Sequence, residues 1–251
     1  MDIKIRYIKK SEVTKLLRFN KENYHPGHIL MNKKYIDWQF GSFPSPLSYY
    51  TILGIFNHKS NLLGVLGLTF LDYSCFGKKV RCTSFANLMV KEKLRNLGLG
   101  YMLMQEAEKI NPIVLDHGVN NDAIRLFYGR GWDGEDLKRY GFVFDGSNIK
   151  KVIKKKNASI KNSVASKVPQ ENLKFITLKQ YDRRLDNFFK NANKNYPVSV
   201  SRSREYLNWR YFKNPLVKYR IFAGVRKNKI ESFAVVRIEG PKSFKVARII
   251  D

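Results

Sequence analysis

The sequence predicts a mixed α/β fold made of two related units, and three observations lead to this prediction. Residues 82–110 form a β-rich apolar run ("CTSFANLMV"), a glycine-containing turn ("KEKLRNLGLG") and a segment with apolar residues at helical spacing ("YMLMQEAEKI"). Upstream, two long β-like runs flank "NHKSN", as in an antiparallel hairpin. The chain also repeats part of its own pattern.

Size and composition fit a folded chain of one large or two small domains. The 251 residues are 43% hydrophobic and 14% aromatic, well above the disordered range. No apolar run reaches the roughly 18 residues that a membrane span needs, and the N-terminal "MDIKIRYIKKSEVTK" lacks the apolar core of a secretory signal. We therefore expect a cytoplasmic protein.

Charge is the strongest global feature. Lys and Arg number 47 against 21 Asp and Glu, a formal net charge of +26. This excess favours a polyanionic partner, which is a nucleic acid, an anionic membrane or a phosphate-bearing small molecule. Compositional drift toward Lys, Asn and Ile is the alternative, although it does not explain the shortage of acidic residues.

The N-terminal segment "IKIRYIKKSEVTKLLRFNKEN" predicts a strand followed by an amphipathic helix. An aromatic-rich stretch, "YHPGHILMNKKYIDWQF", follows, and then the hairpin. Trp38 within this stretch could stack on a sugar or base, or pack in the core. Its recurrence as Trp209 favours packing.

Two cysteines flank a second predicted turn. Cys75 and Cys82 enclose "FGKKVR", and a two-residue turn at Lys78 and Lys79 would place the cysteines opposite one another. We expect a reduced pair in a cytosolic sheet rather than a disulfide. No His/Cys cluster has metal-ligand spacing, so no metal is expected.

A lysine-rich segment divides the chain. Residues 145–170, "DGSNIKKVIKKKNASIKNSVASKVPQ", contain no aromatic residue and mix lysine with Ser, Asn and Ala. Within it, "IKKVIKK" alternates enough for an edge strand. The predicted organisation is a first domain at 1–150, a basic linker at 151–170 and a second, incomplete unit at 171–251.

The second unit repeats the first. Tyr35 and Trp38 correspond to Tyr206 and Trp209, 171 residues later, and in both places a Pro, a Tyr and two β-like runs follow. "LKFITLKQYDRRLDNFFKNAN" likewise repeats the N-terminal strand and helix. The second copy has no equivalent of the glycine turn, so the chain is part of a longer protein or the second unit is a reduced one.

The glycine turn predicts a phosphate site. Backbone N–H groups at a strand-to-helix turn, with the helix N-terminus, form a concave anion site. Glycine allows a ligand to approach the backbone, and Arg95 adds a permanent positive charge. Neither the dinucleotide fingerprint nor the nucleotide P-loop is present.

The motif that is present, V-x-x-x-x-R-x-x-G-x-G from Val90 to Gly100, resembles the pyrophosphate loop of the GNAT superfamily of acyl-CoA-dependent N-acyltransferases. The next segment, "IVLDHGVNNDAIRLFYGRGW", resembles that superfamily's fifth strand and following helix, with Asn120, Ala123 and Gly131 at matching places. "YGFVFDG" would supply a late strand. The resemblance covers residues 1 to about 150.

The resemblance implies acyl-CoA, with acetyl-CoA as the expected co-substrate, and no metal. Backbone groups of strand four would pair with the pantetheine arm, and one of its N–H groups, near Met89 or Val90, would polarise the thioester carbonyl. The residues implied in cofactor binding are Leu88, Met89, Val90, Arg95, Asn96, Leu97, Gly98, Leu99, Gly100, Tyr101 and Asn120.

The resemblance also implies catalytic candidates. The family's acid, a tyrosine that protonates the leaving thiolate, falls at Phe127 here, so its neighbour Tyr128 is assigned, with water as the alternative. His117 and Asp116 are candidate bases for the amine, ahead of His25 and Glu92.

The leading function is thus transfer of an acyl group to a small amine by direct attack in a ternary complex. The acceptor is expected to be anionic, such as a nucleotide-linked amino sugar in polysaccharide biosynthesis. One alternative is a nucleic-acid or anionic-surface binding module on a degenerate GNAT fold. Another is a protein N-acetyltransferase, which would need an acidic acceptor cleft.

Overall fold

The computed structural model describes residues 2–44, 46–136, 173–240 and 245–251. The chain divides into two compact units, one formed by Met1–Leu126 with Lys179–Lys218 and the other by Phe127–Leu178 with Tyr219–Asp251. The helical part of the second repeat therefore belongs to the same unit as the first repeat. The predicted linker at 151–170, the edge strand within it and the late strand "YGFVFDG" lie outside the described residues.

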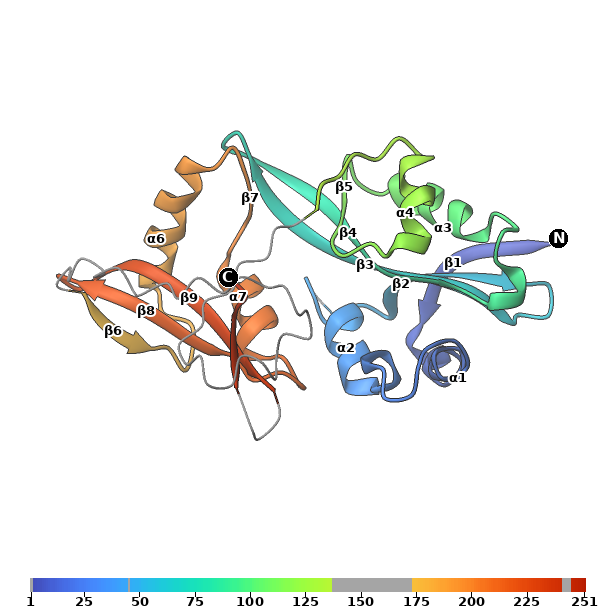
Figure 1. Cartoon of the computed structure of the whole chain (residues 1–251), viewed down its shortest axis with the longest axis horizontal. Helices are drawn as coiled ribbons and strands as arrows, with labels where there is room; N and C mark the ends of the chain where they lie inside the picture. The colour runs from blue at the N-terminus through green and yellow to red at the C-terminus, as the bar shows by residue number, and fades with distance from the viewer. Residues whose placement is uncertain (1, 45, 137–172, 241–244) are drawn as a thin grey trace, which may run out of the picture. The chain divides into compact units, whose positions relative to one another are not determined.

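The first unit is built on a mixed six-stranded sheet (Figure 1). Strands β1 (Ile3–Lys9), β2 (Tyr49–Asn57), β3 (Leu62–Cys75) and β4 (Lys78–Val90) are antiparallel neighbours in that order. β5 (Ile113–Asp116) then pairs in parallel with β4, and β7 (Val198–Val200) pairs with the far end of β3. The predicted hairpin and the strand before the glycine turn are confirmed.

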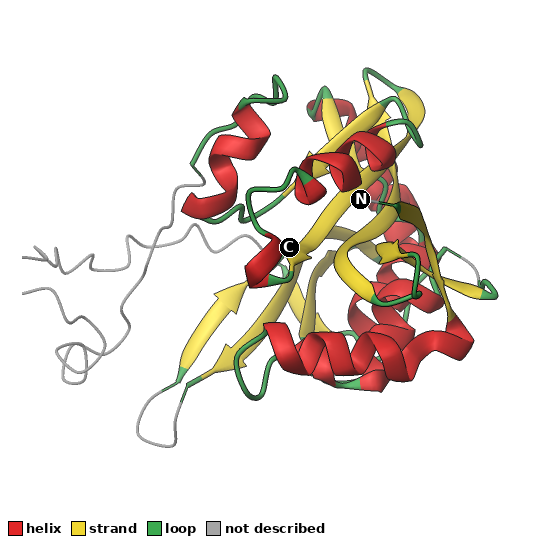
Figure 2. Ribbon diagram, turned by 90° about the vertical axis from the view of Figure 1, so that its right-hand side faces the viewer, coloured by secondary structure: helices red, strands yellow, loops and turns green. Residues whose placement is uncertain are grey.

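Helices cover both faces of this sheet. α1 (Val13–Asn23) and α2 (Lys33–Gly41) pack on one face and α3 (Leu99–Glu108) on the other (Figures 1 and 2). α4 (Asn121–Tyr128) follows β5. A strand covered on both faces needs apolar residues at consecutive positions, which is why β2, "YYTILGIFN", is buried almost throughout. Among the described helices none is long and apolar enough to cross a membrane.

Short helical turns and the helices of the second repeat complete the first unit. Three 3-10 turns span Lys10–Glu12, Ile29–Met31 and Glu92–Leu94. From the second repeat come α6 (Arg184–Ala192), a 3-10 turn (Asn193–Asn195), α7 (Arg204–Leu207) and a π-helical turn (Asn208–Phe212).

The second unit contains a four-stranded antiparallel sheet. Its strands are β6 (Lys174–Thr177), β8 (Arg220–Arg226), β9 (Lys229–Glu239) and β10 (Val246–Ile249), in the spatial order β10-β9-β8-β6. Each of these four strands pairs with the next one of the set, as β1 to β4 do in the first unit. The repeat seen in the sequence is therefore also a repeat of sheet topology.

The two matching tryptophans meet inside the first unit. Trp38 and Trp209 stack with ring centroids 5.1 Å apart, and both are 7% exposed. Each indole donates to the backbone carbonyl of the other residue, at 2.8 Å from Trp38 and 2.9 Å from Trp209. The packing role predicted from their recurrence is confirmed, and the contact is reciprocal, as expected for equivalent positions of a repeat.

The predicted register around the cysteines is wrong. The two-residue turn lies at Phe76 and Gly77, so Cys75 pairs with Lys78, and Cys82 pairs with Leu71. Both turn residues have positive φ, 50° and 78°, as a type I′ hairpin turn requires. Phenylalanine is rare in that conformation, and for that reason the sequence pattern did not reveal the turn. Both cysteines are free.

Candidate functional site

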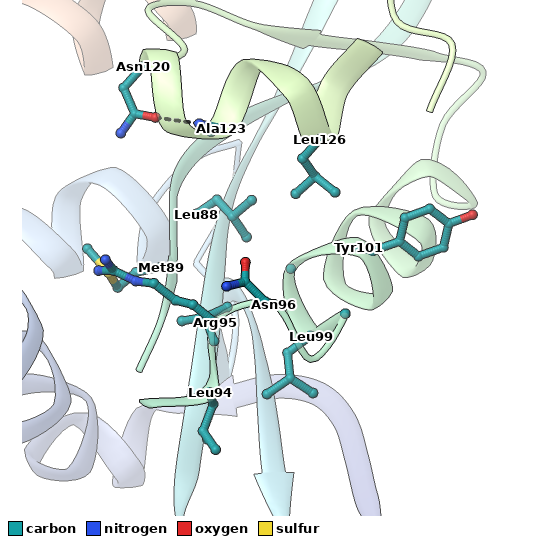
Figure 3. A pocket seen from close by; sticks show the side chains of 13 residues that line it. Leu88, Met89, Leu94, Arg95, Asn96, Leu99, Tyr101, Asn120, Ala123 and Leu126 are labelled. Carbon is teal, nitrogen blue, oxygen red and sulfur yellow. Dashed lines mark hydrogen bonds between the residues drawn. The ribbon is translucent and has the colours of Figure 1, made fainter. Parts of the chain in front are cut away.

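A pocket of about 470 Å³ opens in the first unit where β4 ends and α3 begins (Figure 3). Its volume is in the range of small-molecule sites. It is lined by three segments of the chain, namely the end of β4, the following loop with the first turn of α3, and one side of α4. The lining residues are Leu88, Met89, Val90, Leu94, Arg95, Asn96, Gly98, Leu99, Gly100, Tyr101, Asn120, Ala123 and Leu126.

The loop before α3 and the start of that helix line this pocket. Asn96 and Gly98 have positive φ, 67° and 76°, and the chain then enters α3 at Leu99. No side chain caps the helix at Gly98, so the N–H groups of its first turn, at Leu99 and Gly100, have no capping side chain as partner. Such an N-terminus binds anions through hydrogen bonds and through the helix dipole.

The two glycines of the loop have different roles. Gly98 has the left-handed conformation, and a Cβ there would meet no atom within 4 Å, so its requirement is conformational. Gly100 has ordinary helical geometry, but a Cβ would lie 3.4 Å from Leu126 and 3.8 Å from Leu88. A larger residue at Gly100 would therefore fill the pocket between β4 and α4.

Among the described residues, the end of β4 has no strand partner on its β5 side, next to the pocket. β5 pairs with β4 only from Cys82 to Phe85. Beyond that point a register shift occurs opposite Val65 and Gly67, and Asn87 has a φ of 57°, which together mark a β-bulge. The bulge lies between the paired part of β4 and the pocket.

Hydrogen bonding to β3 shows which backbone groups of β4 face this edge. The Lys91 N–H donates to the Leu63 carbonyl at 3.0 Å. Because backbone groups alternate along a strand, those of Met89 also face β3, whereas those of Val90 and Leu88 face the unpaired side. Leu88 and Val90 therefore can pair with an extended ligand, and Met89, which the sequence also implied, is occupied by β3.

The pocket is apolar with a single positive charge. Arg95 is the charged lining residue, no carboxylate lines the pocket, and Arg95 makes no ion pair within the described part of the chain. The nearby Lys91 lies 3.7 Å from Glu22 on α1. An anionic ligand with an apolar arm matches this distribution of charge.

Asn120 has a structural role in addition to lining the pocket. Its side-chain oxygen accepts from the Ala123 N–H at 2.8 Å, which caps α4 (Figure 3). The capped helix places Ala123 and Leu126, three residues apart, on the pocket side. Sequence reasoning did not assign Ala123, Leu126 or Leu94 to the site; the amphipathic pattern of residues 121–128 is the signal that could have pointed to the first two.

Four predicted site residues are not in the pocket lining: Leu97, Tyr128, Asp116 and His117. Leu97 is 56% exposed and Tyr128 is 54% exposed. On α4, Tyr128 is about 140° around the helix axis from Ala123 and about 200° from Leu126, so its hydroxyl faces another side than these lining residues. Phe127 is buried and makes an edge contact with Trp132.

The candidate bases at the end of β5 also lie outside the lining. The backbone of Asp116 pairs with Phe85, and burial raises the pKa of the Asp116 carboxyl, while a hydrogen bond from the His117 N–H lowers it. His117 is exposed. Neither residue is placed among the pocket residues, and their catalytic roles stay predictions.

The loop between α1 and α2 approaches the bulge of β4. The Tyr24 hydroxyl donates to the Asn87 carbonyl at 3.3 Å, and its ring stacks on His28 with centroids 4.2 Å apart. Burial and the neighbouring His25 lower the pKa of His28. His25 Nδ1 lies 3.0 Å from the Pro26 carbonyl. Since a carbonyl only accepts, Nδ1 carries the proton and Nε2 of neutral His25 is left as an acceptor.

Comparison with known proteins shows the fold. No protein-family model matches the chain, and no curated protein resembles it in sequence. Among solved structures, a GCN5-related N-acetyltransferase from Anabaena variabilis matches 98% of the chain with a TM-score of 0.62 and 12% identity. One from Kribbella flavida matches 99% with a TM-score of 0.58 and 10% identity.

N-myristoyltransferase from Saccharomyces cerevisiae, solved with bound myristoyl-CoA, matches 98% of the chain with a TM-score of 0.57 and 14% identity. The chain spans 61% of that protein and 57% of each of the other two. The expected mixed α/β fold is confirmed, and the chain has the GNAT fold in a tandem arrangement.

Proposed function

We propose that the chain is an acyl-CoA-dependent N-acyltransferase that uses the pocket between β4, α3 and α4. One observation carries the proposal: an uncapped helix N-terminus opens directly beside an unpaired strand edge, within a single apolar pocket. This combination provides a phosphate site and, next to it, a strand-like partner for an amide-containing arm.

The residues present fit acyl-CoA. The N–H groups of Leu99, Gly100 and Tyr101, together with Arg95, would hold the pyrophosphate. Backbone groups of Leu88 and Val90 would pair with the pantetheine amides, because they face the unpaired edge of β4. Acetyl-CoA is the donor we propose, since nothing in the pocket lining calls for a longer chain.

Bound acyl-CoA would supply the activated acyl group as a thioester. The N–H of Val90 or Leu88 would donate to the thioester carbonyl oxygen, where negative charge develops as the amine adds. The C–N bond forms as the C–S bond breaks. The amine gives up one proton to a base, and the thiolate takes up one from water; Tyr128 could supply this proton only if α4 turned its hydroxyl toward the pocket.

The base is best sought on the side of the α1–α2 loop. The Tyr24 contact with Asn87 places this loop at the bulge of β4, and the His25 Nδ1 contact with the Pro26 carbonyl would leave Nε2 of the neutral ring as the acceptor. We propose His25 as a base candidate beside Asp116 and His117. A pH profile that loses its acidic limb in His25→Gln, but keeps it in His117→Gln, would identify it.

We propose a small anionic amine as the acceptor, such as a nucleotide-linked amino sugar. The net charge of +26 and the absence of carboxylates from the lining both favour an anionic acceptor over a basic peptide. A panel of amino sugars with and without a nucleotide, against a lysine peptide, tests this. Preference for the lysine peptide would contradict it.

Calorimetry with acetyl-CoA tests the cofactor site. Wild type should bind in the micromolar range, and Arg95→Gln should weaken binding about tenfold because it loses a charge-assisted contact. Lys59→Gln, the same charge change on the β2–β3 turn, is the control. Gly100→Leu should abolish binding by filling the space next to Leu88 and Leu126.

Backbone conformation is tested separately. Gly98→Ala strains a left-handed residue at the pocket, and Gly27→Ala imposes the same strain at a φ of 80° in the α1–α2 loop. The two variants should lose the same amount of stability, but only Gly98→Ala should lower the affinity for acetyl-CoA. Unchanged affinity in both Arg95→Gln and Gly100→Leu would refute the site.

A further inference from the structure

The turn of the β3–β4 hairpin has an unusual exposed residue. Phe76 is 81% exposed and has a φ of 50°. Positive φ is unfavourable for a bulky side chain, and Asn, Asp or Gly normally occupy this place in a two-residue turn. Phe76 therefore contributes neither to the core nor to turn formation, although it occupies the most prominent position on the hairpin.

Neighbouring residues extend Phe76 into an apolar tip. β7 runs beside the end of the hairpin, with Cys75 paired to Val198 and the Phe76 N–H donating to the Pro197 carbonyl (Figure 1). Tyr196 is 62% exposed and Val198 54%, and Pro197 is exposed between them. We define the apolar tip as Phe76, Tyr196, Pro197 and Val198.

Positive charge is concentrated around this tip. Residues 72–82 and 190–205 contain seven Lys or Arg and two acids, Asp72 and Glu205, against a ratio of 47 to 21 for the whole chain. Asp72 is engaged by Lys79 at 2.9 Å and by Arg81 at 2.8 Å, and Lys79 also interacts electrostatically with Glu205. Lys78, Lys79 and Lys194 are exposed, and we define them as the cationic rim.

The opposite end of β3 shows what an ordinary turn of this sheet looks like. The β2–β3 turn is formed by His58, Lys59 and Ser60, which contain no large apolar side chain. β3 has 14 residues, so the two turns are about 45 Å apart. Of the two turns that flank β3, the β3–β4 turn is thus the one that exposes a large apolar side chain.

We propose that the apolar tip and cationic rim dock the protein on an anionic lipid bilayer. A convex tip fits a fluid surface, into which aromatic side chains can insert, whereas a protein partner would need a matching pocket. Lysines beside the inserted groups bind acidic headgroups. A second copy of the chain is disfavoured because two cationic rims would repel each other. This proposal is independent of the acyltransferase activity.

Single-stranded nucleic acid is the competing polyanion. Binding it requires a basic groove with aromatic rings on which successive bases stack. Phe76 is instead at the apex of a turn and is 81% exposed, and the pocket described above lies elsewhere, between β4, α3 and α4. The bilayer is therefore favoured, and nucleic acid becomes an outcome of the test.

Flotation of the full chain with vesicles tests the proposal. The protein should float with vesicles of phosphatidylcholine that contain phosphatidylglycerol, and should not float with phosphatidylcholine alone. It should also fail to float at 0.5 M salt, because the electrostatic screening length there is on the order of threefold shorter than at low salt. Phe76→Asn should weaken binding about tenfold, because asparagine suits the turn and removes only the inserted ring. Phe175→Thr is the control: it removes a different exposed phenylalanine, which is 70% exposed, and it should have no effect on binding to vesicles.

Two further variants test the role of the lysines and the insertion of residue 76 into the bilayer. Changing Lys78, Lys79 and Lys194 together to Gln should reduce binding roughly a hundredfold, about fivefold for each lysine. The matched change of the exposed Lys4, Lys21 and Lys59 should reduce it much less. In Phe76→Trp the added indole emission should shift to the blue when anionic vesicles are present.

Three results would overturn the proposal. These are failure to float with anionic vesicles at low salt, equal flotation of wild type and Phe76→Asn, or loss in Phe76→Asn of binding to a 30-nucleotide single strand while flotation is unchanged. A dimer in sedimentation velocity that Phe76→Asn dissociates, without flotation of the wild type, would assign the tip to self-association instead. Acyl transfer to a soluble amine should be the same in Phe76→Asn and wild type.

Discussion

At the scale of single residues, the clearest electrostatic feature is the ion pair between β1 and the turn that follows it. Arg6 donates to both carboxylate oxygens of Glu12, at 2.7 and 2.8 Å, and Glu12 also accepts from the Lys9 N–H at 3.1 Å. The hydrogen bonds from Arg6 lower the pKa of Glu12 to about 2. The pair fixes the start of α1 relative to the sheet.

Replacing Glu12 with Gln should lower the free energy of unfolding by about 1–2 kcal/mol at pH 7, after allowance for solvent screening of a partly exposed pair. Because the folded pKa is below the unfolded one, the contribution is present above about pH 4.5 and is lost as pH falls toward 2. Urea unfolding between pH 2 and 7 measures it. A constant difference between wild type and variant across that range would contradict the ion-pair account.

At the scale of elements, local patterns predicted strands and helices better than registers. The strand, turn and helix around Gly98 were predicted because periodicity and glycine positions are local signals. The Phe76–Gly77 turn was not, since its first residue is a poor turn former, and the bulge at Asn87 leaves no mark in the sequence. The pocket lining from α4 was missed for a related reason: Ala123 and Leu126 join it only through tertiary packing.

Packing between α2 and β3 depends on one glycine in the middle of the strand. A Cβ at Gly67 would lie 2.6 and 2.7 Å from ring atoms of Phe40 and 2.9 Å from the Ala86 carbonyl. Gly67→Ala should therefore reduce stability by about 2 kcal/mol through overpacking. Gly134→Ala, where a Cβ meets nothing within 4 Å, is the control in urea unfolding. Equal stability of the two variants would show that Phe40 can move aside.

At the scale of the whole molecule, the repeat was visible in the sequence but its consequence for the domains was not. The offset of 171 residues paired Trp38 with Trp209 correctly as equivalent positions. Composition, however, gave no sign that residues 179–218 would join the first compact unit. Such a grouping follows from contacts between residues far apart in sequence, such as Cys75 with Val198.

The tryptophan pair should be energetically coupled. Trp38→Leu and Trp209→Leu each remove one stacked ring and one indole donor, so the double variant should lose about 1 kcal/mol less than the sum of the single variants. Trp38→Leu combined with Leu103→Ala, on α3, should be additive within about 0.5 kcal/mol. Full additivity for the tryptophans would mean that the reciprocal hydrogen bonds contribute nothing.

The discontinuous first unit has a consequence for synthesis on the ribosome. The chain leaves this unit at Leu126 and returns at Lys179, so the partner of Trp38 is made only after 171 further residues. Until then Trp38 on α2 and the edge of β3 at Tyr73–Cys75, which pairs with β7, are uncovered in the nascent chain. Expression of residues 1–150 alone should accordingly give an aggregation-prone product, whereas a fragment that extends past Lys218 retains β7 and Trp209.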